Sequence, residues 1–185
     1  MQQELVRRAQ GGDHDAFCTL VRGALGRLLS TARLILRDQD RAEDAVQDAL
    51  IEAWRDIRGL RDPDRLDAWL HRLLVRSCYR AARRDRRREV VEIPLSPDDD
   101  AQAPDPAGSL ADRDRVSRAF RKLTEDQRAV LVLIYFADLP LVDVAAALDI
   151  PLGTTKSRLS RATDALRAVL EADERLPELV NGRTR

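Results

Sequence analysis

The sequence predicts an all-α protein built from two small helical domains joined by a flexible acidic linker. Apolar residues recur at helical spacing in both halves of the chain. Few runs show the alternating pattern of β-branched and aromatic residues that marks strands. A proline-rich stretch, EVVEIPLSPDDDAQAPDPAG, separates the two periodic parts. We therefore expect a first domain over residues 1–88, a linker over 89–109, a second domain over 110–171 and a C-terminal tail over 172–185.

Three helices are expected before residue 58. A short helix precedes Gly11 and Gly12. A second follows Asp13, with one apolar stripe formed by Phe17, Val21, Ala24, Leu28, Ala32 and Ile35. A third starts at Asp40, where Glu43 three residues later has the spacing of a capping box. Its polar side is mostly acidic and is typical either of a solvated face or of a protein-facing surface: Glu43, Asp44, Gln47, Asp48 and Glu52.

The fourth helix should start near Asp62 and Pro63, because proline is accepted in a first turn. It carries a ridge of arginines spaced four apart: Arg72, Arg76, Arg80, Arg84 and Arg88. Residues 72–88 hold eight arginines and one acid, a net charge of +7, and residues 89–114 hold eight acids and one arginine, a net charge of −7. The ridge suits a phosphate backbone, or it is a solvated face balanced by the acidic linker.

The second half predicts a helix-turn-helix over residues 141–160, after a helix from about Leu110 to Lys122 and another capped by Thr124. Its turn is Pro151-Leu152-Gly153, and its second helix buries a stripe that includes Thr155 and Leu159. The opposite, polar face could contact guanine edges and phosphates; it consists of Thr154, Lys156, Ser157, Ser160 and Arg161. The alternative is a helical hairpin with a solvated polar face.

The residues do not indicate an enzyme. We find no phosphate loop, nucleophile triad, metal cluster or paired catalytic carboxylates, and we expect no cofactor. Cys18, Cys78, His14 and His71 are each isolated from other metal ligands. No apolar run approaches the length of a membrane span, and the N-terminal MQQELVRRAQ lacks the apolar core of a signal peptide. We therefore expect a cytoplasmic protein with no membrane insertion.

Both halves resemble the two conserved domains of the extracytoplasmic-function sigma factors, the compact branch of the sigma-70 family. In the first half the resemblance is carried by GDHDAF at 12–17, DQDRAEDAVQDALIEAW at 38–54 and LDAWLHRLLVRSCYRAARR at 66–84. In the second half it is carried by LTEDQRAVLVLIYFADLPLVDVAAALDIPLGTTKSRLSRATDALRAVL at 123–170. Two motif sets in the right order are more specific than either set alone.

The resemblance implies a promoter-recognition subunit of RNA polymerase. Its partners would be core RNA polymerase, contacted at the clamp helices through Asp44, Gln47 and Asp48, and promoter DNA. Many relatives are held inactive by an anti-sigma factor, which is a further candidate partner. The acidic linker would run through the polymerase toward the RNA channel. Two other functions stay open on the residues alone: a stand-alone DNA-binding regulator and a sigma-like interaction protein.

The resemblance also implies two DNA-binding sites. The loop from about residue 58 to 65 would hold a flipped base of the −10 element. Around it, the first site would comprise Arg58, Arg61, Arg65, Trp69, Arg72, Arg76, Arg80, Arg83 and Arg84. The second site, for the −35 element, would comprise Thr154, Thr155, Lys156, Ser157, Arg158, Ser160 and Arg161.

The chain departs from the usual family pattern at a few positions. Leu66 and Ser77 stand where phenylalanine and asparagine are usual. Pro140 and Leu141 replace a serine cap and an aromatic residue, and Thr155 replaces a valine. Because proline is still able to start a helix, we expect the helix-turn-helix to form without its usual side-chain cap.

Overall fold

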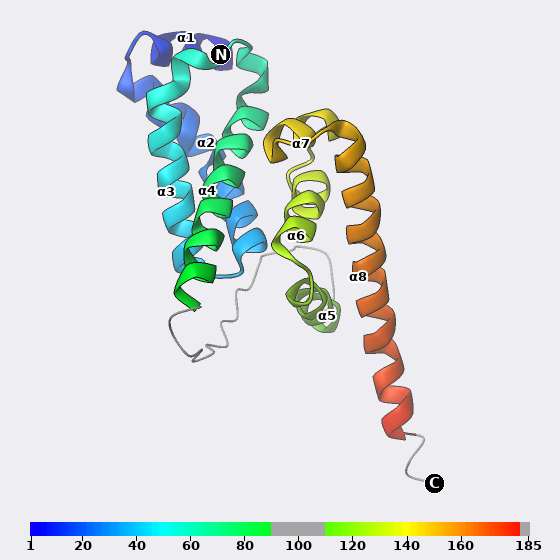
Figure 1. Ribbon diagram of the computed structural model, residues 1–185. Coiled ribbons are helices and arrows are strands. Elements are labelled where there is room, and N and C mark those ends of the chain that lie inside the picture. The colour runs from blue at the N-terminus through cyan, green and yellow to red at the C-terminus, as the bar shows by residue number, and fades with distance from the viewer. Residues whose placement is uncertain (90–109, 182–185) are drawn as a thin grey trace.

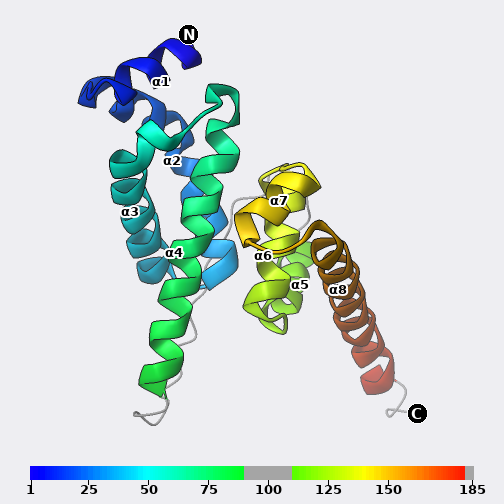
Figure 2. The ribbon, with the colours of Figure 1, turned by 45° about the horizontal axis from the view of Figure 1, so that its top comes forward.

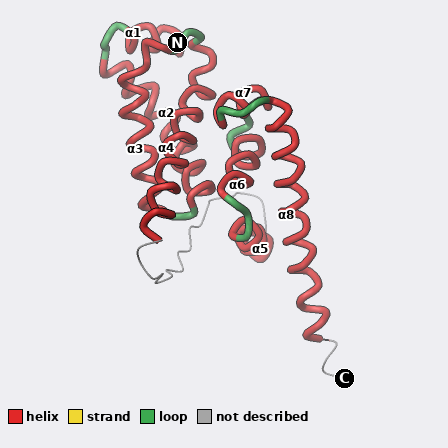
Figure 3. The backbone as a smooth tube through the Cα atoms, viewed as in Figure 1, coloured by secondary structure: helices red, strands yellow, loops and turns green. Residues whose placement is uncertain are grey.

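A computed structural model of the chain describes residues 1–89 and 110–181. All regular secondary structure in these two ranges is helical, which confirms the all-α fold class (Figures 1 and 3). Apart from Glu89, the predicted linker lies outside the described residues. No described helix is long and apolar enough to cross a membrane.

The first half forms a four-helix unit. It consists of α1 (Gln2–Gln10), α2 (His14–Leu36), α3 (Gln39–Asp56) and α4 (Leu66–Glu89), with short 3₁₀ turns η1 (Ile57–Gly59) and η2 (Pro63–Arg65) between the last two helices. α2, α3 and α4 run alongside one another, and α1 lies across one end of them (Figure 1). Their shared core is made of small and branched side chains, including the fully buried Leu28, Ile35 and Leu74.

Side-chain caps set the starts of the helices in this unit. Asp13 accepts a hydrogen bond from the backbone N–H of Ala16 at 3.0 Å, as expected for a residue that starts a helix. The third helix starts two residues earlier than predicted: its cap is Asp38, which accepts from the N–H of Arg41 at 2.9 Å. Asp38 takes this role because its backbone is extended, whereas Asp40 already lies within the helix.

The second half forms α5 (Leu110–Arg121), α6 (Glu125–Leu131), η3 (Val132–Phe136), α7 (Leu141–Leu148) and α8 (Leu152–Asn181). The capping box at Thr124 is present: the N–H of Thr124 donates to Gln127 Oε1 at 2.9 Å, and the N–H of Gln127 donates to Thr124 Oγ1 at 3.3 Å. η3 continues α6 as a π-helix rather than as regular α-helix. α8 runs to Asn181, so the first ten residues of the predicted tail extend this helix.

The two units contact each other through α4 and α7, and both views in Figures 1 and 2 show α7 beside α4. Arg65, next to α4, forms an ion pair with Asp143 of α7. Arg128 of α6 is only 8% exposed and donates from Nε to the carbonyl of Ile35 at 2.7 Å and from Nη1 to the carbonyl of Leu123 at 2.5 Å. We call this packing of α7 on α4 the closed arrangement.

Candidate nucleic-acid and protein interfaces

The helix-turn-helix consists of α7, a short turn and α8. Asp149 adopts the left-handed conformation (φ 56°) that ends α7, and the N–H of Ile150 donates back to the carbonyl of Ala145 at 3.1 Å. α7 starts at Pro140 without a side-chain cap, as expected. The N–H groups of Asp143 and Val144 donate to the Pro140 carbonyl, which is enough to begin the helix.

The first turns of α8 expose a compact polar face, which we call the α8 face: Lys156, Ser157, Ser160 and Arg161, with half-buried Thr154 at its edge. Ser157 Oγ donates to the carbonyl of Thr154 at 3.0 Å, and Arg161 Nε donates to the carbonyl of Ser157 at 3.2 Å. These bonds lie within α8 itself. Because these bonds leave their charges open to solvent, Lys156 and Arg161 are exposed cations, while the other side of α8 packs against α6.

Two residues predicted to contact the −35 element lie apart from the α8 face. Thr155 is fully buried, and its hydroxyl donates to the carbonyl of Pro151 at 3.1 Å, so its side chain is not part of the α8 face. The side chain of Arg158 is 22% exposed and pairs with Asp126 of α6 at 3.4 Å. Thr155 and Arg158 are three residues apart and therefore lie on the same side of α8, the side that packs against α6.

The residues predicted to bind the −10 element fall into three groups. Arg58, Arg61 and Arg65 are exposed on the loop between α3 and α4, and Arg83 is exposed on α4. On α4, Trp69, Arg72 and Arg76 are half-buried. Two others pair with acids of α3: Arg80 with Glu52 at 2.8 Å and Arg84 with Asp48 at 3.5 Å.

These pairs join the two predicted surfaces of the first unit. Asp48 was assigned to a protein partner and Arg84 to DNA, yet here they contact each other. Both side chains are largely exposed, at 48% and 64%, so the pair contributes little stability and is readily exchanged for other partners.

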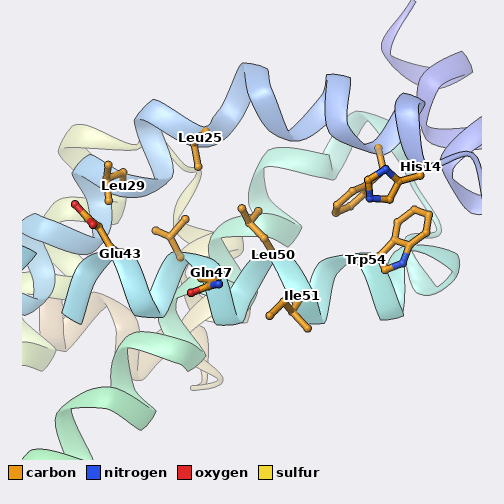
Figure 4. Close-up of a pocket in the computed structure, with 10 residues that line it drawn as sticks. His14, Leu25, Leu29, Glu43, Gln47, Leu50, Ile51 and Trp54 are labelled. Carbon is orange, nitrogen blue, oxygen red and sulfur yellow. The ribbon is translucent and has the colours of Figure 1, made fainter. Parts of the chain in front are cut away.

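Asp44, Gln47 and Asp48 are exposed on α3, and Gln47 borders an apolar hollow between α2 and α3 (Figure 4). The hollow has a volume of about 510 Å³. Glu43 and Gln47 lie at its lip. The rest of its wall is almost entirely apolar and consists of His14, Phe17, Leu25, Leu29, Val46, Leu50, Ile51 and Trp54. Leu25 of α2 and Ile51 of α3 are 41% and 44% exposed, so both helices leave a large apolar side chain open at this hollow.

Sequence reasoning missed this hollow. Apolar residues that lie outside the buried stripe of each helix, such as Leu25 and Ile51, could have indicated it, because the stripe alone is enough to form the core. It also missed the contacts of α1 with the loop between α3 and α4. Among the described residues, no cluster of three or more histidine, cysteine, aspartate or glutamate side chains is arranged to hold a metal.

The fold and these surfaces define a class of protein: a two-unit helical DNA-binding factor that offers one basic face and one acidic, apolar-lined face. Comparison with known families narrows this class. Residues 20–88 match the family model for sigma-70 region 2, and residues 119–168 match the model for sigma-70 region 4.

Individual relatives agree with the family models. The chain is 33% identical over 168 residues to the ECF RNA polymerase sigma factor SigM of Mycobacterium tuberculosis, covering 90% of this chain and 83% of the relative. A solved structure of the sigma factor RpoE from Bartonella quintana, in complex with the anti-sigma factor NepR, is 31% identical with a TM-score of 0.72, covering 85% and 98% of the two chains. A structure of CnrH in complex with the cytosolic domain of CnrY is 26% identical with a TM-score of 0.67, covering 93% and 98%.

The chain therefore belongs to the extracytoplasmic-function branch of the sigma-70 family, and its function is that of an RNA polymerase sigma factor in promoter recognition and transcription initiation.

Proposed function

We propose that the two units divide the work of initiation: the first (residues 1–88) binds core polymerase and the −10 element, and the second (110–171) binds the −35 element. The observation that carries this proposal is the α8 face, which leaves Lys156 and Arg161 exposed on the second helix of a helix-turn-helix. Such a helix enters the major groove, where lysine and arginine pair with guanine edges or phosphates. The protein itself is not an enzyme and acts in the cytoplasm, where the polymerase is.

Core polymerase would bind at α3 and the adjoining hollow. Gln47 at the edge of the hollow and exposed Asp44 on the same helix would supply acceptors for basic side chains, while Leu25 and Ile51 offer apolar surface. A groove of this kind, with an apolar floor and a polar lip, suits the packed helices of the polymerase clamp. Its charged lip would set the register of docking, and its apolar floor would supply most of the affinity.

The −10 element would bind at the loop between α3 and α4 and along α4. Arg58, Arg61 and Arg83 are exposed toward solvent and would approach phosphates, and Arg80 and Arg84 would exchange Glu52 and Asp48 for the DNA backbone. Half-buried Trp69 offers a ring on which an unpaired base could stack.

The solved sigma factor that is bound to an anti-sigma factor makes such a protein a candidate partner here as well. An anti-sigma factor that covered the hollow beside α3 would block core polymerase directly. No separate regulatory domain is needed for this form of control.

Binding of a fluorescent promoter fragment, with and without core polymerase, tests the proposal. We expect tight, sequence-dependent binding only when core polymerase is present, because the α8 face alone offers few contacts. Equally tight and specific binding by the free protein would contradict it and would instead indicate a stand-alone regulator.

A further inference from the structure

α1 is hydrogen-bonded to the loop between α3 and α4 at several points. Gln2 Nε2 donates to the carbonyl of Pro63 at 3.2 Å, and Gln3 Nε2 lies 3.1 Å from both carboxylate oxygens of Asp64. At the other end of α1, Gln10 reaches the η1 turn. These contacts join segments about 50 to 60 residues apart, and all three glutamines of α1 take part in them.

Among these three glutamines, Gln10 makes the contacts with the η1 turn and the residues beside it. Its Nε2 donates to the carbonyl of Leu60 at 2.8 Å and to the carbonyl of Ile57 at 3.2 Å, which uses both hydrogens of the amide. Its own backbone carbonyl accepts from Arg58 Nε at 3.2 Å. One residue of α1 thus fixes two carbonyls of the loop and the direction of an arginine side chain on it.

The loop is anchored on one side and open on the other. Ile57 and Leu60 are 3% and 6% exposed and point into the core, while Arg58, Gly59 and Arg61 between and after them are exposed. Anchoring of α1 itself does not need Gln10, because Val6 and Ala9 are already fully buried against the bundle. The amide of Gln10 therefore acts on the shape of the loop rather than on the attachment of α1.

We propose that Gln10 is a positioning residue for −10 recognition: it holds the η1 turn and Arg58 in the geometry that receives a base of the −10 element. This inference rests on the proposed function, which assigns the loop to that element. A loop that must accept one base and reject others has to be held to a fraction of an ångström, and a two-carbonyl clamp supplies that restraint. Gln10 touches no base itself.

The test uses the holoenzyme, assembled from core polymerase and this chain, on a library of promoters with a randomised −10 element. Sequencing the transcripts gives the base preference at each −10 position. Gln10→Glu removes both donors without changing the side chain's size and places an acceptor against two carbonyls. Arg7→Gln is the matched control, because it makes the same change of charge on α1 but lies on its exposed side, where Arg7 pairs only with Glu4 among the contacts seen.

We expect Gln10→Glu to reduce the preference at one or two adjacent −10 positions by at least about threefold, because each of the two lost hydrogen bonds corresponds to a change of about three- to tenfold. Arg7→Gln should keep the wild-type profile. Gln10→Lys, which restores a donor, should recover part of the preference and covers the case in which Gln10→Glu does not fold.

An unchanged −10 profile in Gln10→Glu would overturn the inference, and so would an even loss of yield at all promoters, which would show a purely structural role. If the wild-type holoenzyme has no −10 preference at all, the assignment of the loop to the −10 element fails instead. The two failures are therefore distinguishable.

Discussion

At the scale of single residues, exposure decides which of the predicted DNA contacts remain. Arg161 is the exposed cation of the α8 face that lies farthest along the helix, and its guanidinium is held by Ser157 of the same helix. Thr155, only six residues earlier, is fully buried. Residue type alone does not separate these two; their position around the helix does.

Arg161→Ala should weaken promoter use by roughly 5- to 100-fold, the range for losing one base or phosphate contact. Affinity for core polymerase should not change, because α8 lies apart from the α3 surface. Arg167→Ala, which removes another exposed arginine of α8 that pairs with Asp164, is the matched control. Transcription titrations and core-binding titrations on the same preparations give both values, and equal loss of the two would contradict the division of labour.

His71 makes the stability of the first unit depend on pH. The imidazole is 1% exposed, and burial lowers its pKa from the usual value, against the opposing effect of the Asp67 carbonyl, which accepts from Nδ1 at 2.8 Å. The folded chain thus keeps His71 neutral, while the unfolded chain takes up a proton as the pH falls through about 6.5. Its contribution to stability is complete above that pH and is lost as the pH falls below it.

Thermal midpoints measured from pH 8 to pH 5.5 check this prediction. The wild-type midpoint should fall across the window more steeply than that of His71→Gln, which has no titrating ring at this position. Parallel curves for the two proteins would show that His71 does not contribute.

At the scale of helices and loops, α3 carries the surface proposed for core polymerase. Gln47 is exposed at the lip of the hollow, Asp44 is exposed on the same helix, and Asp48 pairs with Arg84 of α4. The apolar floor is shared by α2 and α3, so it forms only when the two helices pack side by side, whereas the polar lip is visible in the sequence of α3 alone.

Replacing Asp44 and Gln47 together with alanine should weaken binding to core polymerase by at least about tenfold, since truncating charged interface contacts removes affinity and register. The second unit should stay folded, which circular dichroism would show. The α8 face should also still bind DNA in the holoenzyme when core polymerase is saturating. Asp164→Asn on α8 serves as a charge-changing control. Unchanged affinity for core would refute this docking surface.

The order and approximate bounds of the helices could be predicted from the sequence, because helix starts depend on contacts between residues close together in the chain. Asp13 and Thr124 cap helices because their side chains reach backbone N–H groups three residues ahead, a contact written in the local sequence. The cap of α3 fell on Asp38 rather than Asp40, since aspartates two residues apart are equivalent candidates until the backbone chooses between them. The clamp of Gln10 on the η1 turn joins distant segments, and no local signal reveals it.

At the scale of the whole molecule, the closed arrangement places the proposed −10 helix against the first helix of the helix-turn-helix. The names of the two promoter elements place them about 25 base pairs apart, which is roughly 85 Å of B-DNA. Helices α4 and α7, which contact each other here, cannot reach sites so far apart at the same time. The Arg65–Asp143 ion pair and the Arg128 bond to Ile35 must therefore break when both elements are bound.

Energy transfer between two dyes measures this separation. One dye is placed on α2 by Thr19→Cys and the other on α8 by Ala168→Cys, in a Cys18→Ser background. Cys78 needs no replacement because it is fully buried, and burial raises the pKa of its thiol to about 12. Transfer should be high in the free protein, lower in Arg128→Met, and lowest in the holoenzyme on a promoter. Unchanged transfer on the promoter would show that the closed arrangement persists there.

Run-off transcription shows directly whether this chain gives core polymerase its promoter specificity. Core polymerase, with and without the protein, is supplied with promoters selected from a library randomised at both elements. We expect specific initiation only when the protein is added, with loss of the signal when either the −10 or the −35 element is scrambled. No gain in specific initiation upon adding the folded protein would contradict it.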